Sequence, residues 1–201
     1  MTRQRRTVSM IVSLFFFAGV SATALTMRHA SAEDPLEKTA VLERVVAHLK
    51  GKEVRMHGEK LRAVVDTVYE ESLSRDIDYR LALAVITVES NFKPGVVSNK
   101  GARGLFQIKP SLARYIAKDA GVTFEGAECL KEPDKNIKLG IYHLSRLVED
   151  FRSLPTALNA YNVGETRARK GKGQPKTAFT RRVLKEYQNN ISVLPEAEGT
   201  R

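Results

Sequence analysis

The sequence predicts a mostly α-helical protein with little or no β structure, and three observations indicate this class. Apolar residues recur at intervals of three and four along much of the chain, as on the buried face of a helix. Residues that favour helix starts or ends, such as Asp34-Pro35 and Gly121, separate these periodic runs. Any strand is expected to be short and to lie near Val96-Val97.

Three helices are expected before residue 90. The first has Asp34 as its N-cap and Pro35 at the first helical position, and it continues to about Lys50. The second carries the periodic apolar residues that begin at Leu61. The third follows an N-cap at Asp78. Its buried stripe consists of Leu81, Val85 and Val88.

Four more helices are expected in the second half of the chain. A short helix covers 111–120, and the clearest helix of all starts with Asp134 as its N-cap. The apolar residues of that helix are Ile137, Ile141, Leu144, Val148 and Phe151. Another short helix starts at Pro155 and ends near Gly164. A basic loop at 167–176 then leads into the last helix, whose apolar positions are Phe179, Val183, Tyr187 and Ile191.

The first 32 residues have the features of an export signal. Three arginines precede an apolar stretch at 10–27, and Ala30-Ser31-Ala32 forms a small-residue cleavage site. We therefore expect a signal peptide at 1–32 and a periplasmic mature protein. The apolar stretch could instead be retained as an inner-membrane anchor facing the periplasm. Membrane association is expected only in that case.

Composition narrows the possible partners and cofactors. The chain has a formal net charge of +10, which suits an anionic wall or membrane surface as readily as nucleic acid. No basic stretch with interleaved aromatic residues resembles a nucleic-acid motif, so no nucleic acid is expected. Cys129 is the only cysteine, and no intrachain disulfide can form. His48, His57 and His143 lack the spacing of metal ligands, so no metal or cofactor is expected.

Glu89 ends one of the most hydrophobic runs of the chain, LALAVITV at 81–88, and lies on the same helix face as Leu81 and Val85. Burial disfavours an ionised carboxylate, and the negative end of the helix dipole disfavours it further. Both effects raise the pKa, so Glu89 is a candidate general acid. Its position alone leaves open a solvated glutamate or the partner of a nearby Arg or Lys.

Four blocks of residues extend this hypothesis. The first is Glu89-Ser90, and a loop follows with Ser98, Gly101-Ala102, Gly104-Leu105-Phe106-Gln107-Ile108 and Pro110. The last two are Asn136-Ile137 with Gly140 and His143-Leu144, and Ala160-Tyr161-Asn162-Val163-Gly164. In order and spacing these blocks resemble the transglycosylase SLT domain of soluble-type lytic transglycosylases, whose fold is that of the goose-type lysozymes.

The resemblance implies a lysozyme-like helical domain at 59–191, after an N-terminal helical extension at 33–58 and before a flexible tail at 192–201. It implies an enzyme that cleaves the β-1,4 bond between N-acetylmuramic acid and N-acetylglucosamine in peptidoglycan, closing a 1,6-anhydro ring without water. Peptidoglycan strands would be the partner, and a role in a cell-envelope or secretion assembly stays open.

The same resemblance assigns roles to five residues. Glu89 would act first as the acid and then as the base. The substrate-binding residues would be Ser98, Gln107, Tyr161 and Asn162. Residues 106, 143 and 179 depart from the family, which has Met at the first position and commonly Tyr at the other two, whereas this chain has Phe, His and Phe. Phe106 is an apolar replacement, and the hydroxyl missing at Phe179 concerns fine substrate contacts and not the reaction class.

Two alternatives remain at this point. An inverting hydrolase needs a second carboxylate to activate water. No acid lies between Glu89 and Asp119, and Asp134 is interpreted as a helix N-cap. A hydrolytic lysozyme-like muramidase on the same fold is the first alternative, and the lack of a second carboxylate near the motif counts against it. A non-catalytic wall-binding or assembly protein is the second alternative.

Overall fold

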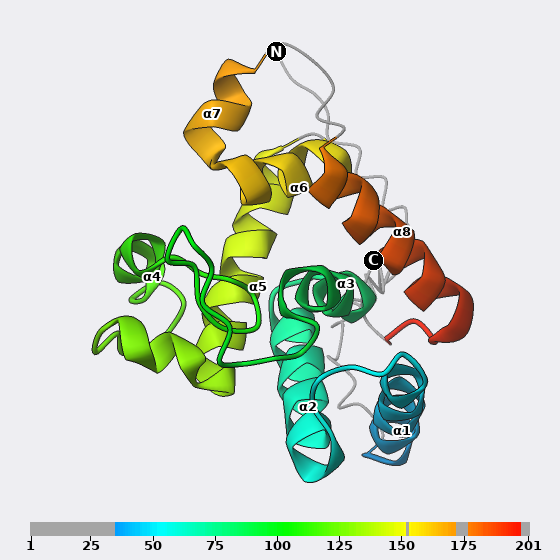
Figure 1. Cartoon of the computed structure of the whole chain (residues 1–201). Coiled ribbons are helices and arrows are strands. Elements are labelled where there is room, and N and C mark those ends of the chain that lie inside the picture. The colour runs from blue at the N-terminus through cyan, green and yellow to red at the C-terminus, as the bar shows by residue number, and fades with distance from the viewer. Residues whose placement is uncertain (1–34, 152, 172–176, 198–201) are drawn as a thin grey trace, which may run out of the picture. The chain divides into compact units, whose positions relative to one another are not determined.

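The computed structural model of the chain describes residues 35–151, 153–171 and 177–197. Within these ranges the secondary structure is helical, with helices α1 to α8 and one short 3₁₀ helix, η1 (Figure 1). Two isolated β-bridges join Arg103 to Val97 and to Ile108. The predicted class is confirmed, and the bridges lie where a short strand was expected.

Helices α1 (Pro35–Gly51), α2 (Gly58–Ser74) and α3 (Tyr79–Ser90) are the three expected in the first half. The Asp34 N-cap lies outside the described residues. Asp78 is confirmed as the N-cap of α3, because its Oδ1 accepts a hydrogen bond from the backbone N–H of Arg80 at 2.8 Å.

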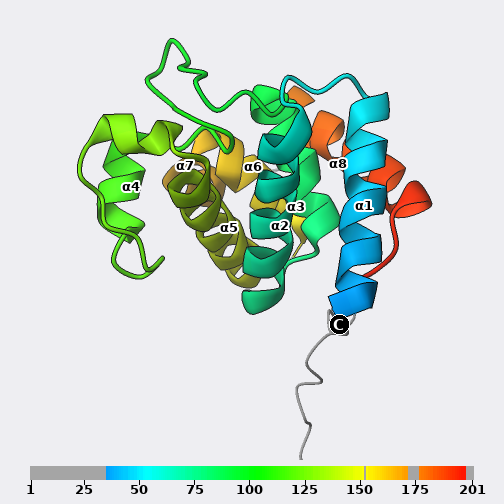
Figure 2. The same cartoon turned by 90° about the horizontal axis from the view of Figure 1, so that it is seen from below.

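Helix α3 is the central element of the fold. Its residues 79–86 are all buried, as expected of a helix that is largely apolar around its circumference. It lies between α2 on one side and α8 (Ala178–Val193) on the other (Figures 1 and 2). Helix α1 covers the far side of α2 from α5 (Pro133–Asp150) (Figure 2). The end of α3 that carries Glu89 is therefore held by a packed core.

The second half contains α4 (Pro110–Ile116), η1 (Ala127–Lys131), α5, α6 (Leu154–Val163), α7 (Glu165–Lys170) and α8. The N-cap predicted for α5 is wrong. Glu132 occupies the cap, and Pro133 takes the first helical position, which it favours because its missing N–H has no partner there. Asp134 instead lies in the first turn, where its Oδ2 is 3.1 Å from Nζ of Lys138.

The segment expected to be a basic loop is partly helical. Helix α7 includes residues 165–170, and residues 172–176 lie outside the described part. An ion pair one turn apart supports this helix, with Arg169 Nη2 at 2.9 Å from Glu165 Oε1. The Arg169 guanidinium also lies 4.9 Å from the centroid of the Phe151 ring. These contacts are not visible in a run of basic residues and glycines.

Beyond the expected domain boundary at 191, α8 continues to Val193, and the following Leu194 and Ala197 are buried. The Tyr79 hydroxyl donates a hydrogen bond of 2.6 Å to the carbonyl of Pro195. Ile191, expected in the buried stripe, is exposed, whereas Asn190 is buried.

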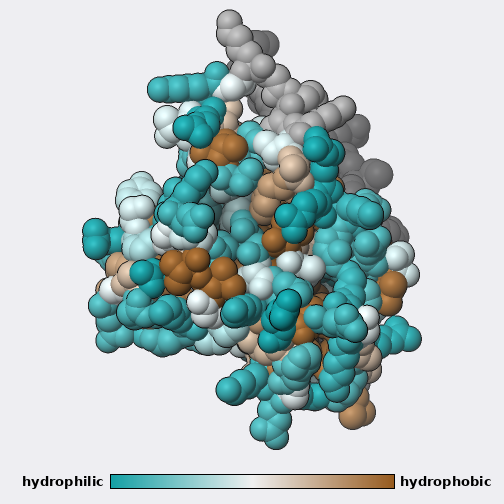
Figure 3. All heavy atoms as spheres, viewed as in Figure 1, coloured by the Kyte–Doolittle hydropathy of each residue, from teal (hydrophilic) through white to brown (hydrophobic). Residues whose placement is uncertain are grey.

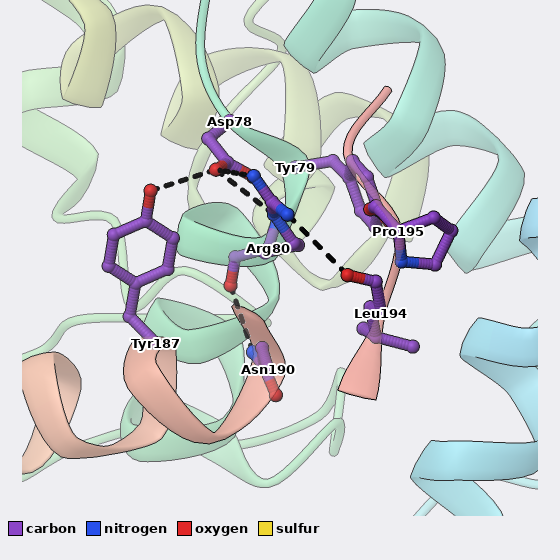
Figure 4. A network of polar contacts seen from close by, with 7 residues as sticks. All are labelled: Asp78, Tyr79, Arg80, Tyr187, Asn190, Leu194 and Pro195. Carbon is purple, nitrogen blue, oxygen red and sulfur yellow. Dashed lines mark hydrogen bonds and ion pairs between the residues drawn. The ribbon is translucent and has the colours of Figure 1, made fainter. Parts of the chain in front are cut away.

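A polar network fastens α8 to the start of α3 (Figure 4). The Asp78 carboxylate accepts hydrogen bonds from the Arg80 guanidinium at 2.7 Å and from the Tyr187 hydroxyl at 2.8 Å. Asn190 donates to the Arg80 carbonyl at 2.9 Å, and Arg80 Nη1 donates to the Leu194 carbonyl at 3.4 Å. The position of α8 against α3 is thereby set by directional bonds as well as by apolar packing.

Helix α1 also holds α8. His48 Nε2 lies 3.2 Å from Asn190 Oδ1, and Lys52 forms an ion pair with Glu186. In the part of the chain that the structure describes, no helix is both long and apolar enough to cross a membrane. The expected leader at 1–32 lies outside that part.

Candidate active site

Glu89 lies in the last turn of α3 and is half-buried. Burial raises the pKa of Glu89 to about 7, and the positive charge of Arg182 opposes this rise. A raised pKa agrees with the expectation from the sequence. At neutral pH the Glu89 carboxyl group is thus divided between its protonated and ionised forms, as a group that must both donate and accept a proton requires.

The chain turns sharply after Glu89. Asn91 ends α3 in the left-handed conformation with φ of 46°, and the buried Phe92 follows with φ of 60°. A positive φ is unusual for an aromatic residue and has a cost in free energy. The loop that begins here packs against α5 and α6.

Ser98 stabilises a turn within this loop. Its Oγ accepts a hydrogen bond from the backbone N–H of Ala102 at 3.1 Å, and its carbonyl accepts from Gly101 N–H at 2.9 Å. Gly101 has φ of 76°, which favours glycine. The structure therefore gives Ser98 a turn role, and the Ser98 hydroxyl can still donate its own hydrogen.

Gln107 is held in place by the same loop. Its backbone has φ of 51°, and its Nε2 donates hydrogen bonds to the carbonyls of Val96 at 3.2 Å and Gly104 at 2.9 Å. Both amide hydrogens are thereby used. The side-chain oxygen of Gln107 remains as the group that can accept a hydrogen bond from a ligand.

Asn136 anchors the loop to α5, a role that sequence reasoning missed. Its buried side chain accepts a hydrogen bond from the backbone N–H of Phe106 at 2.8 Å. It also donates to the carbonyls of Arg103 at 3.0 Å and Leu130 at 2.9 Å. The signal available in the sequence was its place in the Asn-Ile-x-x-Gly block.

Two glycines allow the loop to lie directly against its neighbours. A Cβ atom at Gly104 would collide with the Leu130 carbonyl and the Asn136 side chain. A Cβ atom at Gly140 would collide with the Phe106 ring. These glycines are required by close approach, and Gly104 also has φ of 79°.

Tyr161 connects the loop to α6. Its hydroxyl donates a hydrogen bond of 2.7 Å to the Phe106 carbonyl, next to Gln107. Burial raises the pKa of Tyr161 well above its ordinary value, and the charge of Glu89 raises the pKa further. Tyr161 thus lies within electrostatic reach of Glu89 and stays protonated. Asn162, the next residue, is exposed.

His143 and Phe179, the two other positions that depart from the family, both have their rings beside that of Tyr161. The His143 ring centroid is 5.3 Å from that of Tyr161, and the Phe179 ring stacks on Tyr161 at 6.1 Å with an angle of 3°. Burial lowers the pKa of His143 to about 4, with Glu165 opposing, so its imidazole is neutral at physiological pH. The site therefore has an aromatic wall contributed by α5, α6 and α8.

The structure brings Glu89 and Tyr161 together, with Ser98 and Gln107 on the loop that Tyr161 holds. On the face shown in Figure 3, the surface is hollowed in the region that α3, α5 and α6 surround in Figure 1. Among the described residues no carboxylate acts on the pKa of Glu89, and no three His, Cys, Asp or Glu side chains cluster as metal ligands would. The arrangement offers one acid-base group beside hydrogen-bonding groups.

The helical architecture and the single half-buried carboxyl group agree with the lysozyme-like domain expected from the sequence. Residues 66–183 match the family model of the transglycosylase SLT domain, and the chain belongs to this family. The matched range lies within the expected domain at 59–191.

Comparison with relatives and solved structures supports the assignment. The chain is 35% identical over 97 residues to a soluble lytic murein transglycosylase of Salmonella typhimurium, covering 47% of this chain and 15% of that protein. It is 41% identical over 73 residues to an endo-type membrane-bound lytic murein transglycosylase A of Klebsiella pneumoniae, covering 35% and 36%.

The fold is that of the 70 kDa soluble lytic transglycosylase of Escherichia coli, with a TM-score of 0.58 and 23% identity. That match covers 63% of this chain and 24% of the other, so the chain corresponds to a fraction of these larger proteins.

Proposed function

We propose that this protein is an exported lytic transglycosylase that cleaves the glycan strands of peptidoglycan and leaves 1,6-anhydro-muramic ends. The observation that carries the proposal is the half-buried Glu89. Burial raises the pKa of Glu89 to about 7, and the loop that follows it lies within the range that matches the SLT family model. Relatives named as murein transglycosylases support the choice of substrate.

The proposed reaction uses one carboxyl group twice. Protonated Glu89 donates its proton to the glycosidic oxygen, and the bond between that oxygen and C1 of the muramic residue breaks. The acetamido group of the substrate stabilises the electron-poor C1. Ionised Glu89 then takes the proton of the 6-hydroxyl as its oxygen bonds to C1, which restores the acid and consumes no water. A second carboxylate, needed to activate water in an inverting hydrolase, has no role here.

We assign the other site residues to substrate binding and positioning. The side-chain oxygen of Gln107 and the hydroxyl of Ser98 would bind polar groups of the sugar. Tyr161 would position the loop through its bond to the Phe106 carbonyl, and its protonated state suits that role. Asn162 is exposed beside it and would contact the strand.

We place the mature protein in the periplasm on the basis of the signal-like residues 1–32. The relatives include one named soluble and one named membrane-bound, so retention of the leader as an inner-membrane anchor is the alternative. Comparing the mass of the mature protein from a periplasmic extract with that from a membrane fraction would separate the two.

Digestion of purified sacculi tests the reaction. Wild type should release muropeptides with anhydro ends, each lighter by one water than the reducing form, and Glu89→Gln should release none. Glu149→Gln, which changes an exposed glutamate on α5, is the matched control and should behave as wild type. Reducing muramic ends would indicate the hydrolytic alternative. Binding of sacculi without release by wild type would indicate a non-catalytic wall protein.

A further inference from the structure

Arg182 is an exposed arginine at the edge of the candidate active site. It lies in the second turn of α8, three residues after Phe179. Residues three apart are neighbours on one face of a helix, so Arg182 lies beside the ring that stacks on Tyr161 at 6.1 Å. Among the residues that the structure describes, no carboxylate forms an ion pair with Arg182.

The position of Arg182 is determined by the fold. The Asp78 and Arg80 network of Figure 4 fastens the second half of α8 to α3. At the other end Thr177 caps the helix, with its hydroxyl accepting from Thr180 N–H at 3.1 Å. Arg182 therefore belongs to a helix that is held at both ends, one turn from the aromatic wall.

The charge of Arg182 does not assist the acid by itself. It lowers the pKa of Glu89, against the effect of burial, whereas a general acid benefits from holding its proton. It also disfavours the positive charge that develops on C1 of the sugar as the glycosidic bond breaks. A cation at this place that has no ion pair among the described residues is consistent with a negative group that arrives with the substrate.

We infer that Arg182 binds a carboxylate carried by the muramic side chain of the glycan strand, so that the site selects anionic strands. The inference rests on the proposed function, because it names a feature of that substrate. Muramic acid bears a lactyl carboxylate that is free in peptide-free strands and amide-linked in strands with stem peptides, which carry carboxylates of their own. A planar guanidinium can hold a carboxylate through two parallel hydrogen bonds.

Binding of this carboxylate has a consequence for Glu89. Among the described residues, Arg182 from α8 acts on the pKa of Glu89, and the protonated Tyr161 from α6 responds to its charge. Within the part of the chain that the structure describes, the charge of Arg182 is the only influence that lowers the pKa of Glu89, and a bound carboxylate neutralises that charge. The acid is then more fully protonated with an anionic strand in place than in the free enzyme.

The experiment compares three substrates: peptide-free strands, the same strands with their lactyl carboxylates amidated, and strands with stem peptides. For Arg182→Gln we expect KM to rise about tenfold on the strands whose carboxylate is bound, and little on the amidated strands. Arg182→Lys should recover part of the loss, since lysine keeps the positive charge but cannot form two parallel hydrogen bonds to a carboxylate. Lys185→Gln, an exposed cation one turn away, is the control and should match wild type.

The pattern of losses identifies the source of the carboxylate. A loss on peptide-free strands alone assigns the lactyl group, and a loss on peptide-bearing strands alone assigns the stem peptide. A loss on amidated strands as large as that on the other two kinds, or no loss on any kind, would overturn the inference.

A binding measurement on the inactive Glu89→Gln variant tests the role of Arg182 without depending on the proposed reaction. Affinities of the three kinds of strand are measured by calorimetry for Glu89→Gln with and without Arg182→Gln. A preference for free or peptide-bearing strands over amidated strands that Arg182→Gln abolishes supports the inference, and equal affinity for all three kinds overturns it. Absence of anhydro products from wild type refutes the proposed reaction alone.

Discussion

Replacing Glu89 by glutamine should stabilise the protein in a way that depends on pH. The pKa of Glu89 is raised in the folded protein, so the folded state binds this proton more tightly than the unfolded chain. Stability is therefore lost as pH rises between the unfolded and the folded pKa, and the loss is complete above the folded value. A glutamine cannot ionise, and the variant escapes this loss.

The size of the effect follows from the two pKa values. Burial raises the pKa of Glu89 from 4.5 to about 7. A difference of about 2.5 corresponds to about 3.4 kcal/mol, which is the largest free energy that ionisation of Glu89 can cost the folded state. Glu89 is half-buried, and water on its open side reduces this cost. We expect about 1–3 kcal/mol.

Urea unfolding at about pH 5 and about pH 8 measures this difference. The effect of Glu89→Gln on the free energy of unfolding should be more favourable at the higher pH by about 1–2 kcal/mol, because part of the loss has already occurred at pH 5. Glu149→Gln should show no such difference, because its carboxylate is exposed. Equal effects of Glu89→Gln at the two pH values would refute the buried, proton-holding glutamate on which the proposed mechanism depends.

Three further predictions concern activity and the loop. The kcat/KM of wild type should fall about tenfold per pH unit above about 7, as Glu89 loses its proton; a profile flat to pH 9 would contradict this. Asn136→Ala leaves the N–H of Phe106 without its partner and should lower the free energy of unfolding by about 2–4 kcal/mol in urea titrations; a loss within experimental error would exclude the anchoring role. Tyr161→Phe removes one hydrogen bond to the loop and should cost about 1 kcal/mol of stability and lower kcat; unchanged kcat would remove Tyr161 from the positioning of the loop.

Local patterns were sufficient to predict helices α1 to α6 and α8 and the raised pKa of Glu89, whereas α7 and η1 were missed. The raised pKa of Glu89 was foreseeable because helical periodicity places residue 89 on the face of Leu81 and Val85, and burial follows from that face. N-cap residues were less predictable. Asp78 caps α3 as predicted, but α5 has Glu132 as its N-cap and Pro133 at the first helical position, so Asp134 lies inside the helix. A proline and an acid compete for neighbouring positions, and the sequence alone does not decide between them.

Contacts between residues far apart in the chain could not be predicted from local sequence patterns. Asn136 bonds to the backbone of Phe106, thirty residues away in the chain, and no local pattern specifies such a partner. Arg182 illustrates the same limit, because periodicity predicts only that it is on the surface. Its closeness to Glu89 arises from the way α8 crosses α3, which the polar network and apolar packing decide together.

The contacts of α1 with α8 affect how the domain could be shortened. A protein trimmed to the family match at 66–183 would lose α1, the start of α2 and the half of α8 that carries Glu186, Tyr187 and Asn190. The buried apolar core would lose the side chains that α1 contributes, such as Val45 and Leu49, and Asp78 and Arg80 would lose their partners on α8. A stable fragment is therefore expected to be longer than the family match at 66–183. Recombinant fragments should begin at Pro35 or earlier and extend through Ala197.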